Sequence, residues 1–207
     1  RPRGIFSAGS EEPNALVEVG DGPFKDPNTK ATTVELYDGL KASSQNFLGS
    51  VNFDCMAIND LLKNFIGAGF YYKTFMWPKR LWEKIYEPVI RRAAGLGKLS
   101  LEADPSQYDK GYLHCDFLIV GSGISGLMSA LLLAETGSEI LFVEEDFTIG
   151  GRLNSEKLVL NGKKSSVWVD HVVKKLKNCK NVRILTRTTV YAAFDHGIFT
   201  ALEKKTD

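Results

Sequence analysis

The sequence predicts an α/β fold built around a parallel strand–helix–strand unit. A short apolar run over residues 115–120 is typical of a buried parallel strand. The glycine-rich hexapeptide 121–126 follows it directly and opens a run of apolar residues at helical spacing, which ends at Gly137. A second apolar run over residues 139–143 ends in three acidic residues. The whole unit has the length of about 30 residues that is usual for this motif.

Composition sets limits on partners and location. The 207 residues include 26 Lys and Arg against 25 Asp and Glu, a net charge of +1, so we expect neither nucleic acid nor an anionic membrane as a partner. The longest apolar stretch, residues 124–134, is too short to span a bilayer. Cys55, Cys115 and Cys179 form no CxxC pair, which favours free thiols in a reducing cytoplasm. The histidines are equally scattered, so no metal site is expected.

Residues 1–50 are polar and rich in turns. Short extended pieces are expected at residues 15–19 and 32–37, with a turn at residues 20–23 between them. This region has few large apolar residues, so we expect it to pack on another segment or to end a longer domain.

Two helices are expected between residues 59 and 94. The first begins after Asn59 or Asp60 and ends at Gly67, and the second has Pro78 in its first turn. This region also holds a dense set of aromatic residues: Phe70, Tyr71, Tyr72, Phe75, Trp77, Trp82 and Tyr86. Such a set is typical either of a core or of a permanent subunit interface. Residues 95–110 have the composition of a linker.

Further elements follow the strand–helix–strand unit. A turn is expected at residues 161–162 and an amphipathic helix after Ser166, with Trp168, Val172 and Leu176 on one face. Residues 182–185 are expected to form a third strand. Residues 189–194 and 198–202 are expected to pair as strands across a tight turn at residues 195–197.

The glycine hexapeptide fits the fingerprint of a Rossmann-type dinucleotide-binding unit, because it follows a strand and opens a helix. Gly121 allows a tight turn, Gly123 lets backbone approach a pyrophosphate, and Gly126 lets the helix pack on the sheet. The helix N-terminus offers N–H groups to the phosphates. The predicted contact residues are Gly121, Ser122, Gly123, Ile124, Ser125 and Gly126. The alternative is a tight turn in an α/β domain without a ligand.

Glu144 lies 23 positions after Gly121, near the place of the acid that binds the adenosine ribose. A carboxylate there accepts hydrogen bonds from the ribose hydroxyls and repels a 2′-phosphate, which favours NAD or FAD over NADP. Glu145 and Asp146 could take this role instead if the register is off by one. The alternative is an acidic loop that only faces solvent.

Gly150, Gly151 and Arg152 form a second candidate loop, in which two glycines permit close approach and the guanidinium can pair with a phosphate. A plain surface loop is the alternative. No catalytic set of side chains is evident, so any redox chemistry has to come from a cofactor.

Several stretches of this chain resemble the alpha subunit of bacterial heterotetrameric sarcosine oxidases. They are residues 1–6 (RPRGIF), 11–17 (EEPNALV), 31–39 (ATTVELYDG), 70–78 (FYYKTFMWP) and 86–95 (YEPVIRRAAG). The likeness covers nearly the whole chain. In place of the family's frequent Gly-Pro-Ala, this chain has Gly123-Ile124-Ser125, which keeps all three glycines.

The resemblance implies a longer parent protein and three regions in this chain. Residues 1–50 would be the tail of an N-terminal ferredoxin-like domain, and residues 51–113 a helical connecting segment and linker. Residues 114–207 would be the first, incomplete part of a dinucleotide-binding domain of the disulfide-reductase-like flavoprotein class. Members of that broad class carry redox cysteines just after the second glycine loop. This chain has Arg152-Leu153-Asn154 there, so dithiol chemistry is not expected.

The resemblance also implies a function. The alpha subunit of such complexes is associated with NAD, and it assembles with beta, gamma and delta subunits. Sarcosine is oxidatively demethylated to glycine at a flavin of the beta subunit, the one-carbon unit passes to tetrahydrofolate, and oxygen is reduced to hydrogen peroxide. FAD, FMN and tetrahydrofolate would lie elsewhere in the complex.

By residue match, Gly121, Gly123, Gly126, Glu144 and Gly151 would bind the dinucleotide, and Thr189 and Val190 would border its adenine. Two alternatives stay open. One is an FAD-binding subunit of a related amine or opine dehydrogenase, and the other is a non-catalytic assembly subunit with a structural nucleotide.

Overall fold

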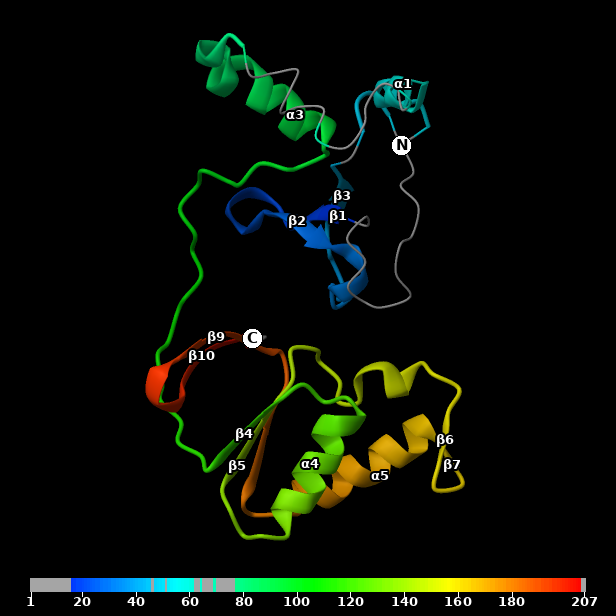
Figure 1. The fold of residues 1–207 in the computed structure, drawn as a ribbon, viewed down its shortest axis with the longest axis vertical. Helices are drawn as coiled ribbons and strands as arrows, with labels where there is room; N and C mark the ends of the chain where they lie inside the picture. The colour runs from blue at the N-terminus through cyan, green and yellow to red at the C-terminus, as the bar shows by residue number, and fades with distance from the viewer. Residues whose placement is uncertain are drawn as a thin grey trace. The chain divides into compact units, whose positions relative to one another are not determined.

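The computed structural model describes residues 16–45, 47–50, 52–61, 64, 69 and 77–205. The chain forms two compact units, Arg1–Tyr108 and Asp109–Asp207 (Figure 1). The division into regions 1–50, 51–113 and 114–207 stays a prediction. Residues 1–15 and 70–76, which carry part of the family resemblance and most of the aromatic set, lie outside the described residues.

The first unit contains a small antiparallel sheet of three strands in the order β2-β1-β3. They are β1 (Leu16–Val19), β2 (Asp26–Lys30) and β3 (Ala42–Ser44). The expected turn between β1 and β2 is confirmed, because the Asp21 carboxylate accepts the Gly22 N–H at 2.9 Å and caps the 3-10 turn Gly22–Phe24. Pro27 is tolerated because β2 is an edge strand, where no ladder donor is needed on the outer side.

The prediction of an extended segment at residues 32–37 is wrong. The chain forms a 3-10 turn at Ala31–Thr33 and no strand over residues 34–37. Instead, β2 directly precedes this turn and pairs with β1. The β-branched composition of residues 32–34 favours a strand, but strand formation depends on a pairing partner as well as on propensity.

Helical structure follows in the same unit. Helix α1 covers Ile58–Leu61, and the rest of the helix expected up to Gly67 lies largely outside the described residues. The second expected helix is confirmed as a continuous segment: a 3-10 turn Lys79–Leu81, a π turn Trp82–Tyr86, and α3 (Glu87–Ala93). Pro88 has no N–H to donate to the Lys84 carbonyl, and its ring crowds that carbonyl. The helix therefore widens here, and the Glu87 N–H donates to the carbonyl of Trp82, five residues back.

The second unit contains the predicted strand–helix–strand motif. Strand β4 (Phe117–Val120), helix α4 (Ile124–Ala134) and strand β5 (Ile140–Val143) follow one another. Strand β8 (Val182–Leu185) joins the same sheet, whose order is β4-β5-β8 with parallel pairing throughout. The α/β fold class and the third strand are therefore confirmed.

Helix α5 (Ser165–Lys177) packs beside α4 (Figure 1). The hairpin of β6 (Val159–Leu160) and β7 (Lys163–Lys164) precedes α5 and turns at Asn161-Gly162 as expected. The buried core lies between these two helices and the sheet. It consists of Leu127, Ala130, Ile140, Phe142, Leu153, Trp168, Val169, Val172 and Leu176.

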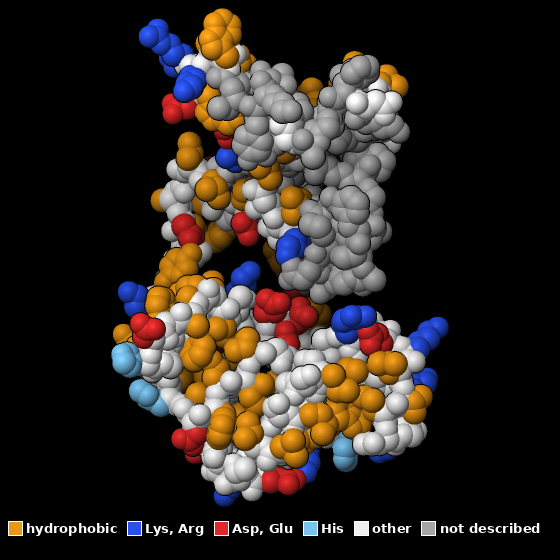
Figure 2. Space-filling model, viewed as in Figure 1, with side chains coloured by type: hydrophobic (Ala, Val, Ile, Leu, Met, Phe, Trp, Pro, Cys, Tyr) orange, Lys and Arg blue, Asp and Glu red, His pale blue; other side chains and the backbone are white. Residues whose placement is uncertain are grey.

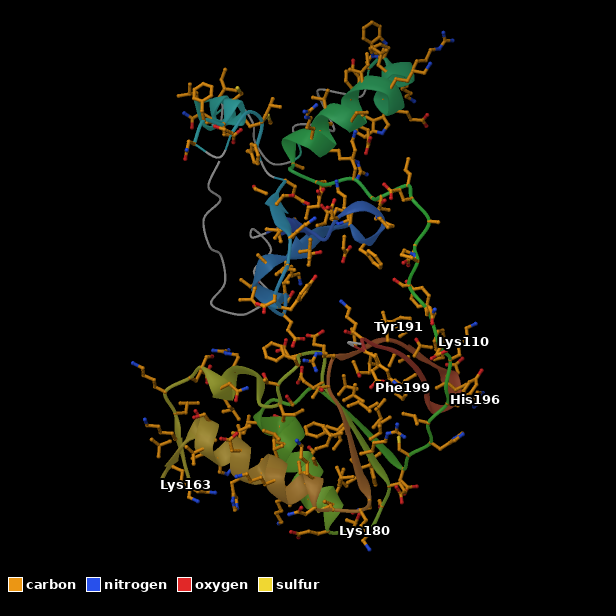
Figure 3. The ribbon with its side chains drawn as sticks, turned by 180° about the vertical axis from the view of Figure 1, so that it is seen from behind. Lys110, Lys163, Lys180, Tyr191, His196 and Phe199 are labelled. Atoms are coloured by element: carbon orange, nitrogen blue, oxygen red, sulfur yellow. The ribbon has the colours of Figure 1, made fainter. Side chains whose placement is uncertain are left out.

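The second unit ends in a hairpin of β9 (Thr188–Phe194) and β10 (Ile198–Glu203), which confirms the expected pair of strands. Tyr191 and Phe199 lie on this hairpin and His196 lies in its turn (Figure 3). Both aromatic side chains are exposed. In the described parts of the chain, no helix combines the length and the apolar character needed to cross a membrane.

The fold makes a prediction about Gly126. A Cβ atom at this position would overlap the carbonyl oxygen of Gly121, which is backbone and cannot move aside cheaply. We expect Gly126→Ala to lower the free energy of unfolding by about 1–3 kcal/mol, the usual cost of overpacking. Denaturant titration of the full chain measures this. Ser129→Ala, an exposed position on the same helix, is the control, and equal stability of both variants would contradict the prediction.

Candidate functional site

The glycine loop lies at the carboxyl end of β4 and is tied to β5. Gly121 has φ of +91°, and its N–H donates to the Val143 carbonyl at 2.8 Å. This left-handed backbone lets the chain leave the strand in a tight turn, as the sequence predicted. Gly126 then packs against Gly121 from the first turn of α4. The loop is therefore folded back on itself by a backbone contact that leaves no room for a side chain at Gly126.

Gly123 presents backbone to open space. It is the N-cap of α4, and its carbonyl accepts the Leu127 N–H at 3.0 Å. A Cβ atom built on Gly123 would meet nothing within 4 Å. No side chain caps this helix end, so its first N–H groups stay available to a ligand. This is the arrangement that a pyrophosphate needs at a helix N-terminus.

Glu144 follows β5 and is 6% exposed. Its Oε2 accepts the Ser122 N–H at 2.6 Å and its Oε1 accepts the Asp146 N–H at 3.0 Å. The acid predicted to hold the ribose is thus already engaged in holding the glycine loop. Each carboxylate oxygen can accept a further hydrogen bond, so the predicted contact with ribose hydroxyls is compatible with these bonds.

The two acids after Glu144 have different surroundings. Glu145 is exposed, whereas Asp146 is half-buried. Burial, and then the nearby Glu144 charge, raise the pKa of the Asp146 carboxyl above its ordinary value of 3.8. The N–H of Arg187 donates to the Asp146 carbonyl at 3.0 Å, which connects this loop to the turn before β9.

The second glycine loop meets the first. Gly150 has φ of +125° and donates its N–H to Ser122 Oγ at 2.8 Å. Gly151 has φ of +50°, and a Cβ atom on it would lie 3.7 Å from the Gly123 Cα. The structure therefore brings Gly121, Gly123, Gly150 and Gly151 together at one edge of the sheet.

The Arg152 side chain already has an acidic partner in this structure. Its guanidinium forms an ion pair of 2.6 Å with Glu156, and its side chain is 77% exposed. The phosphate pairing that the sequence predicted for Arg152 would therefore compete with Glu156.

Thr189 and Val190 are brought to the site by their neighbour. The Thr188 N–H donates to the Glu144 carbonyl at 2.9 Å, which places the start of β9 beside the end of β5. Thr189 is exposed and Val190 is half-buried. Thr188 itself is buried, and sequence reasoning missed it because a threonine that begins a strand carries no functional signal.

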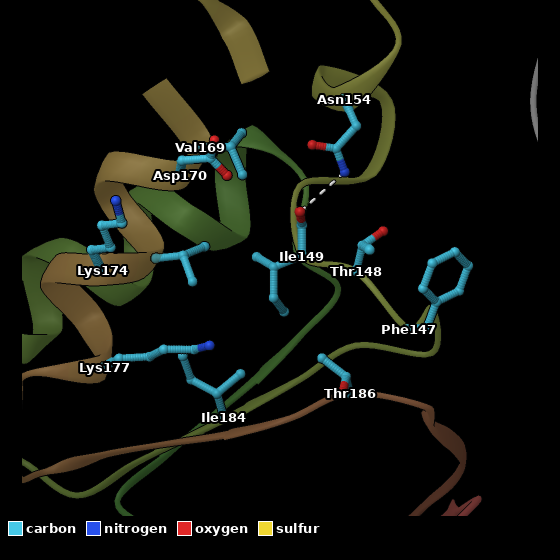
Figure 4. Close-up of a pocket in the computed structure, with 11 residues that line it drawn as sticks. Phe147, Thr148, Ile149, Asn154, Val169, Asp170, Lys174, Lys177, Ile184 and Thr186 are labelled. Carbon is cyan, nitrogen blue, oxygen red and sulfur yellow. Dashed lines mark hydrogen bonds between the residues drawn. The ribbon is translucent and has the colours of Figure 1, made fainter. Parts of the chain in front are cut away.

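A separate hollow of about 680 Å³ lies between the loop after β5, helix α5 and strand β8 (Figure 4). Ile149, Val173 and Ile184 give it apolar walls, and Lys174 and Lys177 add positive charge. Asn154 Nδ2 donates to the Ile149 carbonyl at 3.0 Å beside it. None of its lining residues is a predicted nucleotide contact, and no motif in the sequence indicated it.

Comparison with known proteins supports both halves of the predicted organisation. The family of NAD(P)-binding Rossmann-like domains matches residues 119–185. The family of 2Fe-2S iron-sulfur cluster binding domains matches residues 1–47. The Rossmann-type unit and the ferredoxin-like N-terminal piece are therefore confirmed.

Two relatives that match nearly the whole of this chain have the same name. The chain is 51% identical over 204 residues to sarcosine oxidase subunit alpha of Rhizobium meliloti (strain 1021), covering 99% of this chain and 21% of that protein. It is 30% identical over 210 residues to the subunit of the same name from Corynebacterium sp. (strain U-96), covering 100% of this chain and 17% of that protein. The predicted resemblance is thus confirmed, and the chain spans about a fifth of the length of these relatives.

A solved structure also matches part of this chain. L-proline dehydrogenase from P. horikoshii matches 46% of this chain and 21% of its own chain, with 26% identity and a TM-score of 0.39.

The ferredoxin-like match raises the question of an iron–sulfur cluster. Clusters of this kind are held by cysteine thiolates, or by a mixture of cysteine and histidine. Residues 1–47 contain neither cysteine nor histidine. Among the described residues of the whole chain, no group of three or more His, Cys, Asp or Glu is placed to hold a metal. The residues of this segment therefore do not fit a cluster.

The burial of Asp146 leads to a prediction about pH. Because its pKa is raised in the folded protein, the folded state binds more protons than the unfolded state, and stability falls as pH rises through this window. We expect Asp146→Asn to raise the free energy of unfolding at pH 7 and to change nothing at pH 3, below the ordinary pKa. Urea titrations at both pH values measure this. Glu145→Gln is the control for the loss of one exposed charge. If Asp146→Asn also raised the free energy of unfolding at pH 3, the raised pKa of Asp146 could not be the cause.

Proposed function

We propose that this chain is the dinucleotide-binding part of a sarcosine oxidase alpha subunit and that NAD is its ligand. The observation that carries the proposal is the meeting of two glycine loops at the N-terminus of α4, where Gly123 presents bare backbone to open space. The 51% identity to a sarcosine oxidase alpha subunit supplies the biological setting. The Rossmann-like match over residues 119–185 supports the ligand class.

In this proposal the residues that meet at the site have distinct physical roles. Backbone N–H groups at the start of α4 hold the pyrophosphate through hydrogen bonds and the helix dipole. Gly123 and Gly151 permit close approach from two sides. The free lone pairs of Glu144 accept ribose hydroxyls, and its charge disfavours a 2′-phosphate. Thr189 and Val190 border the adenine from the start of β9.

When bound, the dinucleotide would be a structural or redox ligand of this chain. In the whole complex we propose oxidative demethylation of sarcosine to glycine at the beta subunit. The one-carbon unit passes to tetrahydrofolate and oxygen is reduced to hydrogen peroxide. The beta, gamma and delta subunits are the proposed partners, and the cytoplasm is the proposed location.

An assembly role is favoured by a separate observation. All buried hydrophobic core residues among those described belong to the unit Asp109–Asp207. In the other unit, Trp77 is 84% exposed and Leu101 is 100% exposed. Figure 2 shows hydrophobic side chains at the surface of both units. Such apolar surface is typical of subunit interfaces, so the alpha chain would also serve to assemble the complex.

The identity of the nucleotide is tested on the purified native protein. Denaturation followed by mass spectrometry of the released small molecules identifies what was bound. We expect NAD. Release of FAD instead would favour the amine or opine dehydrogenase alternative, in which this chain takes part in electron transfer. Release of neither would favour the assembly role.

The role of Gly123 is tested by Gly123→Ala. A methyl group there would enter the open space assigned to the pyrophosphate, so we expect the Kd for NAD to rise at least about ten-fold, as when a hydrogen bond to a charged group is lost. Because the added Cβ meets no protein atom, stability should change by no more than about 1 kcal/mol, the cost of a weaker N-cap. Titration calorimetry and denaturant unfolding measure the two quantities. Unchanged NAD affinity would count against a phosphate site at this position.

A further inference from the structure

Ser122 stands out among the loop residues because its side chain is completely buried. Its N–H donates to Glu144 Oε2 at 2.6 Å, and its Oγ accepts the Gly150 N–H at 2.8 Å. The two partners lie 22 and 28 positions further along the chain. One serine therefore bonds to two segments, the end of β5 and the second glycine loop, while itself standing at the end of β4.

The second loop is held from its other side by packing. A Cβ atom on Gly150 would lie 2.6 Å from Asn154 Oδ1 and 2.9 Å from Val169 Cγ1. Gly150 thus has protein behind it and the Ser122 hydroxyl as its hydrogen-bond acceptor. Gly151, the next residue, lies against Gly123. The bond to Ser122 consequently fixes the distance between the two glycine backbones that face the proposed pyrophosphate.

We propose that Ser122 is a positioning residue that fixes the second glycine loop against the first, so that both form one cradle for the pyrophosphate. This inference rests on the proposed nucleotide-binding function. It also changes the role of Ser122, because a side chain that is 0% exposed cannot contact a nucleotide directly. Ser122→Ala removes the acceptor and leaves the Gly150 N–H buried without a partner, which displaces Gly151.

Binding of two ligands can distinguish a positioning role of Ser122 from a general effect on the folded structure. ADP carries a pyrophosphate, whereas adenosine carries none and would use only the ribose and adenine contacts. For Ser122→Ala in the full chain we expect the Kd for ADP to rise about ten-fold, as for one lost hydrogen bond, and the Kd for adenosine to change less than two-fold. Calorimetry measures ADP, and competition against ADP measures adenosine. Ser129→Ala, exposed on α4, is the matched control and should leave both affinities unchanged.

The possible outcomes are distinct. Equal ADP affinity of Ser122→Ala and the unaltered chain would overturn the positioning role while leaving the proposed function standing. An equal loss for ADP and adenosine would also overturn it, because it indicates a general structural effect. If the unaltered chain does not bind ADP, the proposed function fails, and the positioning role with it.

If Ser122→Ala does not fold, Ser122→Cys keeps a side chain of similar shape with a weaker acceptor. We then expect the affinity for ADP to fall by less than about ten-fold and the affinity for adenosine to stay unchanged. ADP affinity unchanged in a folded Ser122→Cys protein would overturn the proposal.

Discussion

The hydrogen bond between the Ser122 N–H and the Glu144 carboxylate is the constraint on which the candidate site depends. A carboxylate that is only 6% exposed is costly to bury unless donors compensate its charge. Ser122 and Asp146 supply two backbone donors, and bonds of this kind to a charged acceptor are among the stronger ones in proteins. The dependence is mutual, since without Glu144 both N–H groups would lose their acceptor. Glu144 therefore determines the shape of the glycine loop, in addition to any contact with ribose.

The same residue brings a third segment to the site. Its carbonyl accepts the Thr188 N–H, so the turn after β8 must pass the end of β5 before β9 begins. The second glycine loop is held at the same site by the hydrogen bond from the Gly150 N–H to the Ser122 hydroxyl. Segments that are distant in sequence thus converge at the carboxyl ends of parallel strands, which is where α/β sheets bind their ligands. The convergence depends on buried polar bonds, and the apolar core beneath them, around Phe142 and Leu127, holds α4 and β5 at the distance that these bonds require.

The strand–helix–strand unit could be predicted from sequence because its signals are local. The apolar run before Gly121, the glycine spacing and the helical periodicity all lie within one short segment. Strand β2 could not be predicted, since Pro27 and Asn28 are poor strand formers and Asn28 takes φ of +62°. It exists because β1 supplies the pairing partner. The hydrogen bond from the Gly150 N–H to the Ser122 hydroxyl could not be predicted either, because Gly150 lies 28 positions further along the chain and meets Ser122 only when the chain has folded.

The two units are stabilised in different ways, and this bears on what the chain does. In the second unit, α4 and α5 bury a contiguous core against the sheet. In the first unit, side-chain hydrogen bonds connect the sheet region to the segment after α3: Asn28 Oδ1 accepts the Gly97 N–H at 2.9 Å, and Gln45 Nε2 donates to the Gly95 carbonyl at 3.1 Å. Such bonds contribute little net stability in water compared with apolar burial, while Trp77 and Leu101 remain exposed. Covering these side chains with another subunit would supply the hydrophobic stabilisation that the described part of this unit does not obtain by itself. In the proposed function, nucleotide binding and assembly are then complementary roles that draw on different units of the chain.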